Sequence, residues 1–174
     1  MSTTPVSLEP PFGKLDPSGM AALVDAIPEQ IEQALERTDA APWKLPKHEP
    51  DLIAFGGMGG SAIAGELTAA IYADQLPHPW LVVRDYQWPA CVTAKSLAVL
   101  SSNSGNTEET LALDTEARAR KVPCVVMSSG GELSQRAKAA GDHVQQLPGG
   151  MPPRAALFHA WVPVTRLPAA LGWA

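Results

Sequence analysis

Short continuous hydrophobic runs alternate with longer periodic stretches over the part of the chain that follows residue 50. Continuous apolar runs are typical of strands that are buried on both faces of a sheet. These runs are DLIAFGG, PWLVVRD, SLAVLSS, PCVVMSS and HVQQL. The stretches between them have the helical period, and they are SAIAGELTAAIYA, TEETLALDTEARARK and GELSQRAKAAG, with a last helix expected to begin near Pro153. Strands that alternate with helices predict an α/β fold, a three-layer αβα sandwich around a parallel, five-stranded sheet.

The N-terminal part of the chain has a different pattern. Residues 1–17 contain four prolines and no hydrophobic period, so we expect them to form an extended arm. Helical periodicity follows, and its apolar stripe is Ile27, Ile31 and Leu35. Pro28 suits the first turn of that helix, because the N–H that proline lacks would be unpaired there in any case. We therefore expect N-terminal helices followed by the sandwich, all in a single domain over residues 18–174.

Composition narrows the class of protein. The chain of 174 residues has 45% hydrophobic residues, a net charge of −5 and a pI near 5.3. An acidic balance argues against a nucleic-acid partner, since a nucleic-acid-binding protein presents a basic face. No apolar run reaches membrane-spanning length and no leader pattern opens the chain, so we expect a cytoplasmic protein without a membrane partner.

Cysteine and histidine usage points to no metal or disulfide chemistry. Cys91 and Cys124 each lie beside a valine, and we predict that both are reduced, buried thiols. The four histidines are dispersed along the chain and no C-x-x-C pair occurs, so no metal site is expected.

The first glycine-rich loop, GGMGGSA at residues 56–62, follows the first predicted strand. Gly57, Gly59 and Ala62 match the pattern G-x-G-x-x-A, and Asp85 lies at the end of the next predicted strand. This pattern leaves an NAD(P)-binding domain open as one alternative. A Walker loop is excluded, because no lysine follows the glycines.

The second loop lies in the stretch LSSNSGNTEETL, between a predicted strand and a predicted helix. Small polar side chains crowd this loop, and its hydroxyl groups belong to Ser102, Ser104 and Thr107. Gly105 allows a ligand to approach the backbone closely, and the amides of the following helix N-terminus add donors. A dinucleotide has no use for such a second cluster, whereas one compact phosphate group does. The loop therefore predicts a phosphate site, and helix capping with turn formation remains the alternative.

The start of the following helix sets a condition on this interpretation. Asn106 or Thr107 is expected to cap it, and two glutamates, Glu108 and Glu109, occupy its first turn. Their charges suit the helix dipole but oppose an anion in the loop. A phosphate site requires that both carboxylates point away from it.

A third segment, GGMPPRAAL at residues 149–157, places Arg154 at the start of the last predicted helix. Arg154 is expected either to bind a ligand or to form a surface salt bridge. His159 follows about 140° further round the helix, so it does not share the face of Arg154 and is expected to be a structural, partly buried residue.

Taken together, several segments resemble one protein family over most of the chain, from about Ser18 to the end. The segments are GGMGGSAIAGEL, VVRDY, SNSGNTEETL, SSGGEL and PGGMPPRAAL. They resemble the first domain of the bifunctional phosphoglucose/phosphomannose isomerases, which belong to the sugar isomerase (SIS) domain superfamily.

The resemblance implies a role for each loop. Residues of the glycine loop help to hold the sugar phosphate, and these are Gly59, Gly60 and Ser61. The hydroxyls that grip the phosphate are those of Ser102, Ser104 and Thr107. Arg154 stabilises the enediolate that forms during isomerisation. No cofactor is expected, and the resemblance implies a homodimer or a partner SIS domain.

The chain departs from the family pattern in three respects. Asn103 stands where an aromatic residue is common, and Phe158 and His159 follow PRAAL where a glycine and an aromatic residue are usual. Family members also carry two such domains, and their catalytic glutamate, ring-opening histidine and a lysine come from the second. No counterpart of those three residues is assigned in this chain.

Three functions follow as hypotheses. The first is an aldose–ketose isomerase that converts glucose 6-phosphate or mannose 6-phosphate to fructose 6-phosphate through an enediolate, with the base supplied from outside this chain. The second is a non-catalytic SIS module that binds a hexose 6-phosphate for regulation. The third is the NAD(P)-binding domain.

Overall fold

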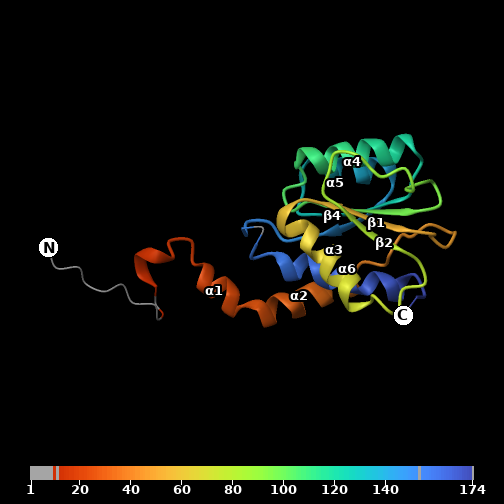
Figure 1. Ribbon diagram of the computed structural model, residues 1–174. Coiled ribbons are helices and arrows are strands. Elements are labelled where there is room, and N and C mark those ends of the chain that lie inside the picture. Colours follow the sequence, from red (N-terminus) through yellow and green to blue (C-terminus); the bar gives the residue numbers. More distant parts are fainter. Residues whose placement is uncertain (1–9, 11, 153, 174) are drawn as a thin grey trace.

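The computed structural model describes residues 10, 12–152 and 154–173 (Figure 1). Its strands are β1 Ile53–Gly57, β2 Trp80–Val83, β3 Leu97–Ser101, β4 Cys124–Ser128 and β5 His143–Gln146. Its α-helices are α1 Met20–Asp25, α2 Ile27–Asp39, α3 Gly59–Ile71, α4 Glu108–Ala119, α5 Gly131–Ala140 and α6 Leu157–Ala170. Each predicted strand and helix is present, and α6 begins a few residues after the position that the sequence suggested.

The five strands form one parallel sheet with the order β2-β1-β3-β4-β5. All four strand pairings are parallel, and β1 pairs with β2 on one side and with β3 on the other. The prediction of an α/β fold with a five-stranded parallel sheet is confirmed. The chain passes from β1 to β2 in one direction and then crosses over to β3, so the direction of winding reverses between β1 and β3.

Helices cover both faces of this sheet, and α4 and α5 lie on one face while α3 and α6 lie on the other (Figure 1). Alternate residues of β3 face the two layers. Ala98 and Leu100 pack in the core with α4 and α5, whereas Leu97 and Val99 pack with α3 and α6. Because both faces are buried, the strands read as continuous apolar runs.

The N-terminal helices extend the α3–α6 layer. Helix α2 packs against α6, and α1 projects beyond the edge of the sandwich (Figure 1). Most of the expected arm, residues 1–9 and 11, lies outside the described residues. In the remainder of that segment, Gly13–Leu15 form a short 3-10 helix.

The prediction that both cysteines are buried is wrong for Cys91, which is exposed, and is confirmed for Cys124. The loop between β2 and β3 buries Trp88 and Val92 instead, so its anchoring positions flank Cys91 rather than include it. Burial raises the pKa of the Cys124 thiol to about 12. Over the described part of the chain, none of the helices has the length and apolar character needed to cross a membrane.

A buried histidine joins α2 to α6. His159 is 3% exposed, and its Nδ1 accepts a hydrogen bond of 2.6 Å from the guanidinium of Arg37. Burial, and to a lesser extent the charge of Arg37, lowers the pKa of His159 from 6.5 to about 4. The expectation that His159 is structural agrees with this contact.

We expect the free energy of unfolding to fall as the pH drops from about 6.5 to 4. In this range His159 is protonated in the unfolded chain but stays neutral in the folded protein, because its pKa is lowered on folding. The loss assigned to His159 is roughly 2–3 kcal/mol at most. His159→Asn keeps an acceptor for Arg37 but does not titrate, so its stability should depend less on pH. Urea denaturation at pH 7 and pH 4.5 measures this, and equal losses in the variant and the parent protein would contradict the assignment.

Candidate functional site

The carboxyl ends of β1 and β3 define the candidate site. In open α/β sheets, ligands bind outside the carboxyl ends of the strands where the direction of winding reverses. Gly57 ends β1 and is in register with Ser101 at the end of β3. A β-carbon on Gly57 would lie 2.9 Å from the carbonyl oxygen of Ser101, so the two strand ends approach closely here. The two loops that the sequence singled out therefore begin side by side.

The β3–α4 loop is held by its own hydroxyl groups. Ser102 is buried, and its Oγ accepts a hydrogen bond of 3.1 Å from the Gly105 amide. The same Oγ lies 2.8 Å from the Thr107 hydroxyl, with which it shares a hydrogen bond. Thr107 is the N-cap residue of α4 by position, but its side chain makes no capping bond. Ser102 thus positions Thr107 and the loop rather than facing solvent.

Ser104 and Thr107 carry the accessible hydroxyl groups of this loop. Ser104 is exposed, and its Oγ accepts a 3.2 Å hydrogen bond from the Asn106 amide, which leaves its proton available to a ligand. Thr107 is partly exposed and directly precedes α4. First-turn amides of a helix have no intrahelical partner, and the helix dipole favours a negative charge beside them. Two hydroxyls and these amides together suit a compact anion.

The next loop along the sheet, between β4 and α5, braces the β3–α4 loop. The amide and hydroxyl of Ser129 both donate to the carbonyl oxygen of Asn103, at 3.1 and 2.5 Å. The Leu133 amide donates to the carbonyl oxygen of Gly105. The sequence analysis assigned no role to the β4–α5 loop, although its SSGG stretch follows a strand and has the same small polar composition as the β3–α4 loop. Its role is to fix the shape of the candidate phosphate loop.

Asn106 belongs to this brace and does not cap α4 as the sequence suggested. Its Oδ1 accepts a hydrogen bond of 2.9 Å from the amide of Glu132, in the first turn of α5. Of the two N-cap candidates, Thr107 is the N-cap residue of α4, although its hydroxyl bonds to Ser102 and makes no capping bond, whereas Asn106 bonds to the neighbouring helix.

The two glutamates of the first turn of α4 act on Tyr86, in the loop after β2. The pKa of the Tyr86 hydroxyl is raised, mainly by desolvation and further by the charges of Glu108 and Glu109. Glu108 is exposed and Glu109 is partly exposed. Among the hydrogen bonds of the described residues, the loop hydroxyls of Ser102, Ser104 and Thr107 have no partner in either carboxylate.

The glycine loop and the β3–α4 loop meet at a small crevice closed by the start of α6. The crevice has a volume of about 10 Å³, and the residues that line it are Gly60, Ser61, Asn103, Leu147, Ala156, Leu157 and Ala160. Gly59 lies at the outer end of the glycine loop, where it is exposed and has a φ of +51°. The structure therefore brings the predicted Gly60 and Ser61 together with the loop that carries Ser102, Ser104 and Thr107.

Arg154 occupies a different place from the other predicted site residues. It is exposed in the turn before α6 and lines a hollow of about 220 Å³ with Ala155, Phe158 and side chains of α1 and α2. Across residues 10, 12–152 and 154–173, no carboxylate forms an ion pair with it. Two residues later, Ala156 lines the crevice. Arg154 thus lies near the site in sequence, but its side chain lines the neighbouring hollow.

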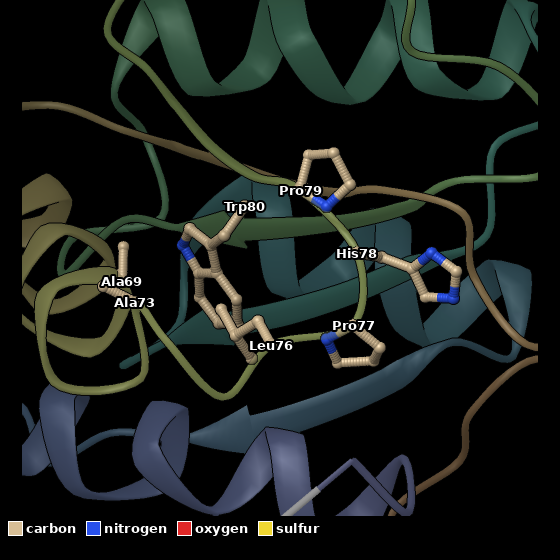
Figure 2. Close-up of a pocket in the computed structure, with 7 residues that line it drawn as sticks. All are labelled: Ala69, Ala73, Leu76, Pro77, His78, Pro79 and Trp80. Carbon is tan, nitrogen blue, oxygen red and sulfur yellow. The ribbon is translucent and has the colours of Figure 1, made fainter.

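A larger hollow of about 340 Å³ lies at the opposite edge of the sheet, before the amino end of β2 (Figure 2). In Figure 2, His78 points away from Trp80, and its Nε2 lies 3.4 Å from the carboxylate of Glu49. This hollow presents no group of donors comparable with the β3–α4 loop. Within the described ranges, no cluster of histidine, cysteine, aspartate or glutamate side chains could hold a metal ion at this edge or elsewhere.

Comparison with curated proteins gives relatives that are named as isomerases and one that is named as an epimerase. The bifunctional phosphoglucose/phosphomannose isomerase of Caldicellulosiruptor bescii is 38% identical over 146 residues, which cover 84% of this chain and 43% of that protein. The D-glucosamine-6-phosphate 4-epimerase of Sulfolobus acidocaldarius is 37% identical over 99 residues, which cover 56% of this chain and 31% of that protein. The chain therefore spans less than half the length of these curated relatives.

Solved structures share the fold. A protein of E. coli CFT073 in complex with A5P superimposes with a TM-score of 0.62 at 18% sequence identity, over 89% of this chain and 90% of that one. No family model matches the chain.

Proposed function

Because the chain belongs to the bifunctional phosphoglucose/phosphomannose isomerase family, we propose that it forms the phosphate-binding part of an aldose–ketose isomerase. The reaction interconverts glucose 6-phosphate or mannose 6-phosphate with fructose 6-phosphate. The observation that carries the proposal is the β3–α4 loop, which presents the hydroxyls of Ser104 and Thr107 beside the N-terminus of α4 at the reversal point of the sheet. The protein in complex with A5P, which has the same fold, supports a sugar phosphate as ligand.

The loop supplies enough donors for binding without a metal or a cofactor. A hydrogen bond to a charged group contributes roughly 1.5–3 kcal/mol. Three or four such bonds correspond to affinities on the millimolar-to-micromolar scale. In this proposal Ser104 and Thr107 contact the phosphate, Ser102 holds Thr107 from beneath, and Gly59, Gly60 and Ser61 contribute the opposite wall.

Isomerisation moves a proton between C2 and C1 of the open-chain sugar and creates negative charge on an enediolate oxygen. A carboxylate serves as the base in such reactions, and a fixed cation stabilises the oxyanion. We assign the cation to Arg154, whose turn leads directly into the residues that close the crevice. The assignment requires its side chain to turn from the neighbouring hollow, which it lines, toward the crevice. Among the residues described as lining that crevice none is acidic or basic, so the base comes from a partner SIS domain or a second copy of the chain.

An exposed apolar stripe on α3 supports such a partner. Ile63, Leu67 and Ile71 recur every four residues and are 37%, 37% and 51% exposed. Apolar stripes of this kind mark interaction surfaces. A homodimer is therefore part of the proposal, as is a cytoplasmic location, which the exposed free thiol of Cys91 favours.

The double variant Ser104→Ala and Thr107→Ala tests the phosphate assignment. We expect it to bind fructose 6-phosphate at least about 100-fold more weakly, because two donors that each contribute roughly 1.5–3 kcal/mol are removed while the backbone amides remain. Isothermal titration calorimetry with fructose 6-phosphate and with inorganic phosphate measures both affinities.

A matched control lies further along the same helix. Thr115→Ala removes a hydroxyl of α4 that bonds to the Leu111 carbonyl and the Arg136 guanidinium, away from the loop. It should leave both affinities unchanged. An unaltered affinity in the double variant would exclude the loop as the phosphate site.

A non-catalytic sugar-phosphate module is the second candidate, and the crevice without acidic or basic residues favours it. In a coupled isomerase assay of the chain, turnover would exclude the non-catalytic module. Binding of fructose 6-phosphate without turnover fits the module and also an enzyme whose base comes from a separate SIS domain, so the assay is repeated with such a domain added, and turnover restored by it supports the enzyme. Stabilisation by NAD(P) but not by fructose 6-phosphate in a thermal-shift titration would favour the dinucleotide alternative.

A further inference from the structure

Asn103 has a side-chain oxygen that the fold leaves without a partner. Its Oδ1 is buried and forms no hydrogen bond with any described residue. A buried acceptor without a partner costs roughly 1–3 kcal/mol, and such groups in native proteins are nearly always paired. The backbone carbonyl of the same residue is fully used, because Ser129 donates to it twice.

The neighbouring polar side chains of the loop differ from Asn103 in this respect. Ser102 bonds to Thr107 and Gly105, Ser104 accepts from the Asn106 amide, and Asn106 accepts from the Glu132 amide. The side chain of an asparagine in a turn ordinarily bonds to nearby backbone. The Asn106 side chain likewise bonds to a backbone amide, but to one in the neighbouring loop. Hydrogen bonds within and between the loops therefore account for the other polar side chains, but not for the side-chain oxygen of Asn103.

The position of Asn103 in the crevice indicates what kind of group could be the hydrogen-bond partner of its side-chain oxygen. Asn103 lines the crevice between the glycine loop and the start of α6, where Ser61 is the only other polar side chain among the described lining residues. The crevice volume of about 10 Å³ is close to that of a single oxygen-sized probe. Ser104, the next residue in the chain, is one of the two hydroxyl residues assigned to the phosphate. A group that binds Asn103 therefore lies beside the phosphate and is about the size of one hydroxyl.

We infer that the Asn103 amide binds a hydroxyl group of the sugar and distinguishes a sugar phosphate from phosphate alone. This inference rests on the proposed function and extends it from the phosphate to the sugar. A hydroxyl both donates and accepts, so it pairs with Oδ1 or, after rotation of the amide, with the amino group. A site that hydrogen-bonds a ligand hydroxyl discriminates strongly against ligands without it, because the buried polar group is then left unpaired. Asn103 is thus a substrate-contacting residue that sets specificity.

The test compares fructose 6-phosphate with inorganic phosphate on the same protein. In Asn103→Ala, we expect the affinity for fructose 6-phosphate to fall about tenfold, while the affinity for inorganic phosphate stays within about twofold. Asn103→Ser is the second variant, and it should show the same selective loss because its shorter hydroxyl does not reach the ligand. Thermal denaturation of each variant establishes that it is folded.

Asn106→Ala is the matched control in the same loop. Its amide oxygen is already engaged by α5, so its loss should lower the melting temperature without a selective effect on fructose 6-phosphate. Equal weakening of both ligands in the Asn103 variants would make Asn103 a structural residue of the loop and overturn the inference. No weakening of either ligand would mean that its oxygen is paired by water, and would also overturn it. If the parent protein binds neither ligand, the proposed function itself fails.

Discussion

Gly105→Ala is expected to lower the free energy of unfolding by more than about 3 kcal/mol. Gly105 has a φ of +69°, a conformation that costs other residues roughly 1–2 kcal/mol. A β-carbon there would overlap the carbonyl oxygen of Gly130 and lie 2.7 Å from the Ser128 hydroxyl. The carbonyl oxygen belongs to backbone and cannot rotate away, so the two loops must separate.

Separation of the loops has a functional consequence as well. The β4–α5 loop fixes the β3–α4 loop through Asn103 and Asn106, so any variant that folds should also bind fructose 6-phosphate weakly. Chemical denaturation gives the stability, and calorimetry gives the affinity of the folded fraction.

Gly141→Ala is the matched control for backbone strain. Gly141 has a similar φ of +79°, but no heavy atom lies within 4 Å of the position of an added β-carbon. Its replacement should therefore cost only about 1 kcal/mol. Equal destabilisation by Gly105→Ala and Gly141→Ala would show that strain alone, and not contact with the neighbouring loop, makes Gly105 necessary.

Asp114→Asn is expected to lower the free energy of unfolding by about 2–4 kcal/mol. Asp114 lies on α4 with a side chain that is 0% exposed, and its carboxylate is 2.8 Å from Arg118 and 3.4 Å from Arg136. An asparagine in its place removes the negative charge between two guanidinium groups and directs an amino group toward one of them. The α4–α5 contact should weaken, because Arg136 joins α5 to this carboxylate.

Glu132→Gln provides the comparison for Asp114→Asn, since Glu132 pairs with the same Arg136 at 2.6 Å but is 52% exposed. Exposed pairs contribute little, so this variant should lose no more than about 0.5 kcal/mol. Urea denaturation of both variants measures the difference. A loss in Asp114→Asn as small as in Glu132→Gln would mean that the buried carboxylate is not required for packing of α4 on α5.

Much of the fold could be predicted from the sequence, because the period of the hydrophobic residues is a local property. Continuous apolar runs predicted the strands, and their alternation with helical stretches predicted a parallel sheet with both faces covered. The location of the site followed from the same pattern, because the carboxyl ends of parallel strands share one edge. The polar loop around Ser104 and Thr107 was therefore identifiable before its surroundings were known.

The partners of individual side chains could not be predicted, because they lie far away in the sequence. Asn106 bonds to the first turn of a helix that begins 25 residues later, and the burial of Ser102 could not be predicted from its place in a polar loop. Arg154 lines a hollow against α1 and α2, more than 120 residues before it. Cys91 is exposed because its neighbours in the loop supply the buried anchors.

The sequence by itself determined the class of fold, the edge of the sheet that carries the candidate site and the small polar loop that lies there. Only the tertiary structure decided that the β4–α5 loop braces the β3–α4 loop, that Ser102 is buried and bonds to Gly105, and that the Asn103 oxygen has no partner among the described residues. The physical reason is that periodicity and turn composition act over a few neighbouring residues. Hydrogen-bond satisfaction and burial depend instead on which distant segments the packed sheet brings together.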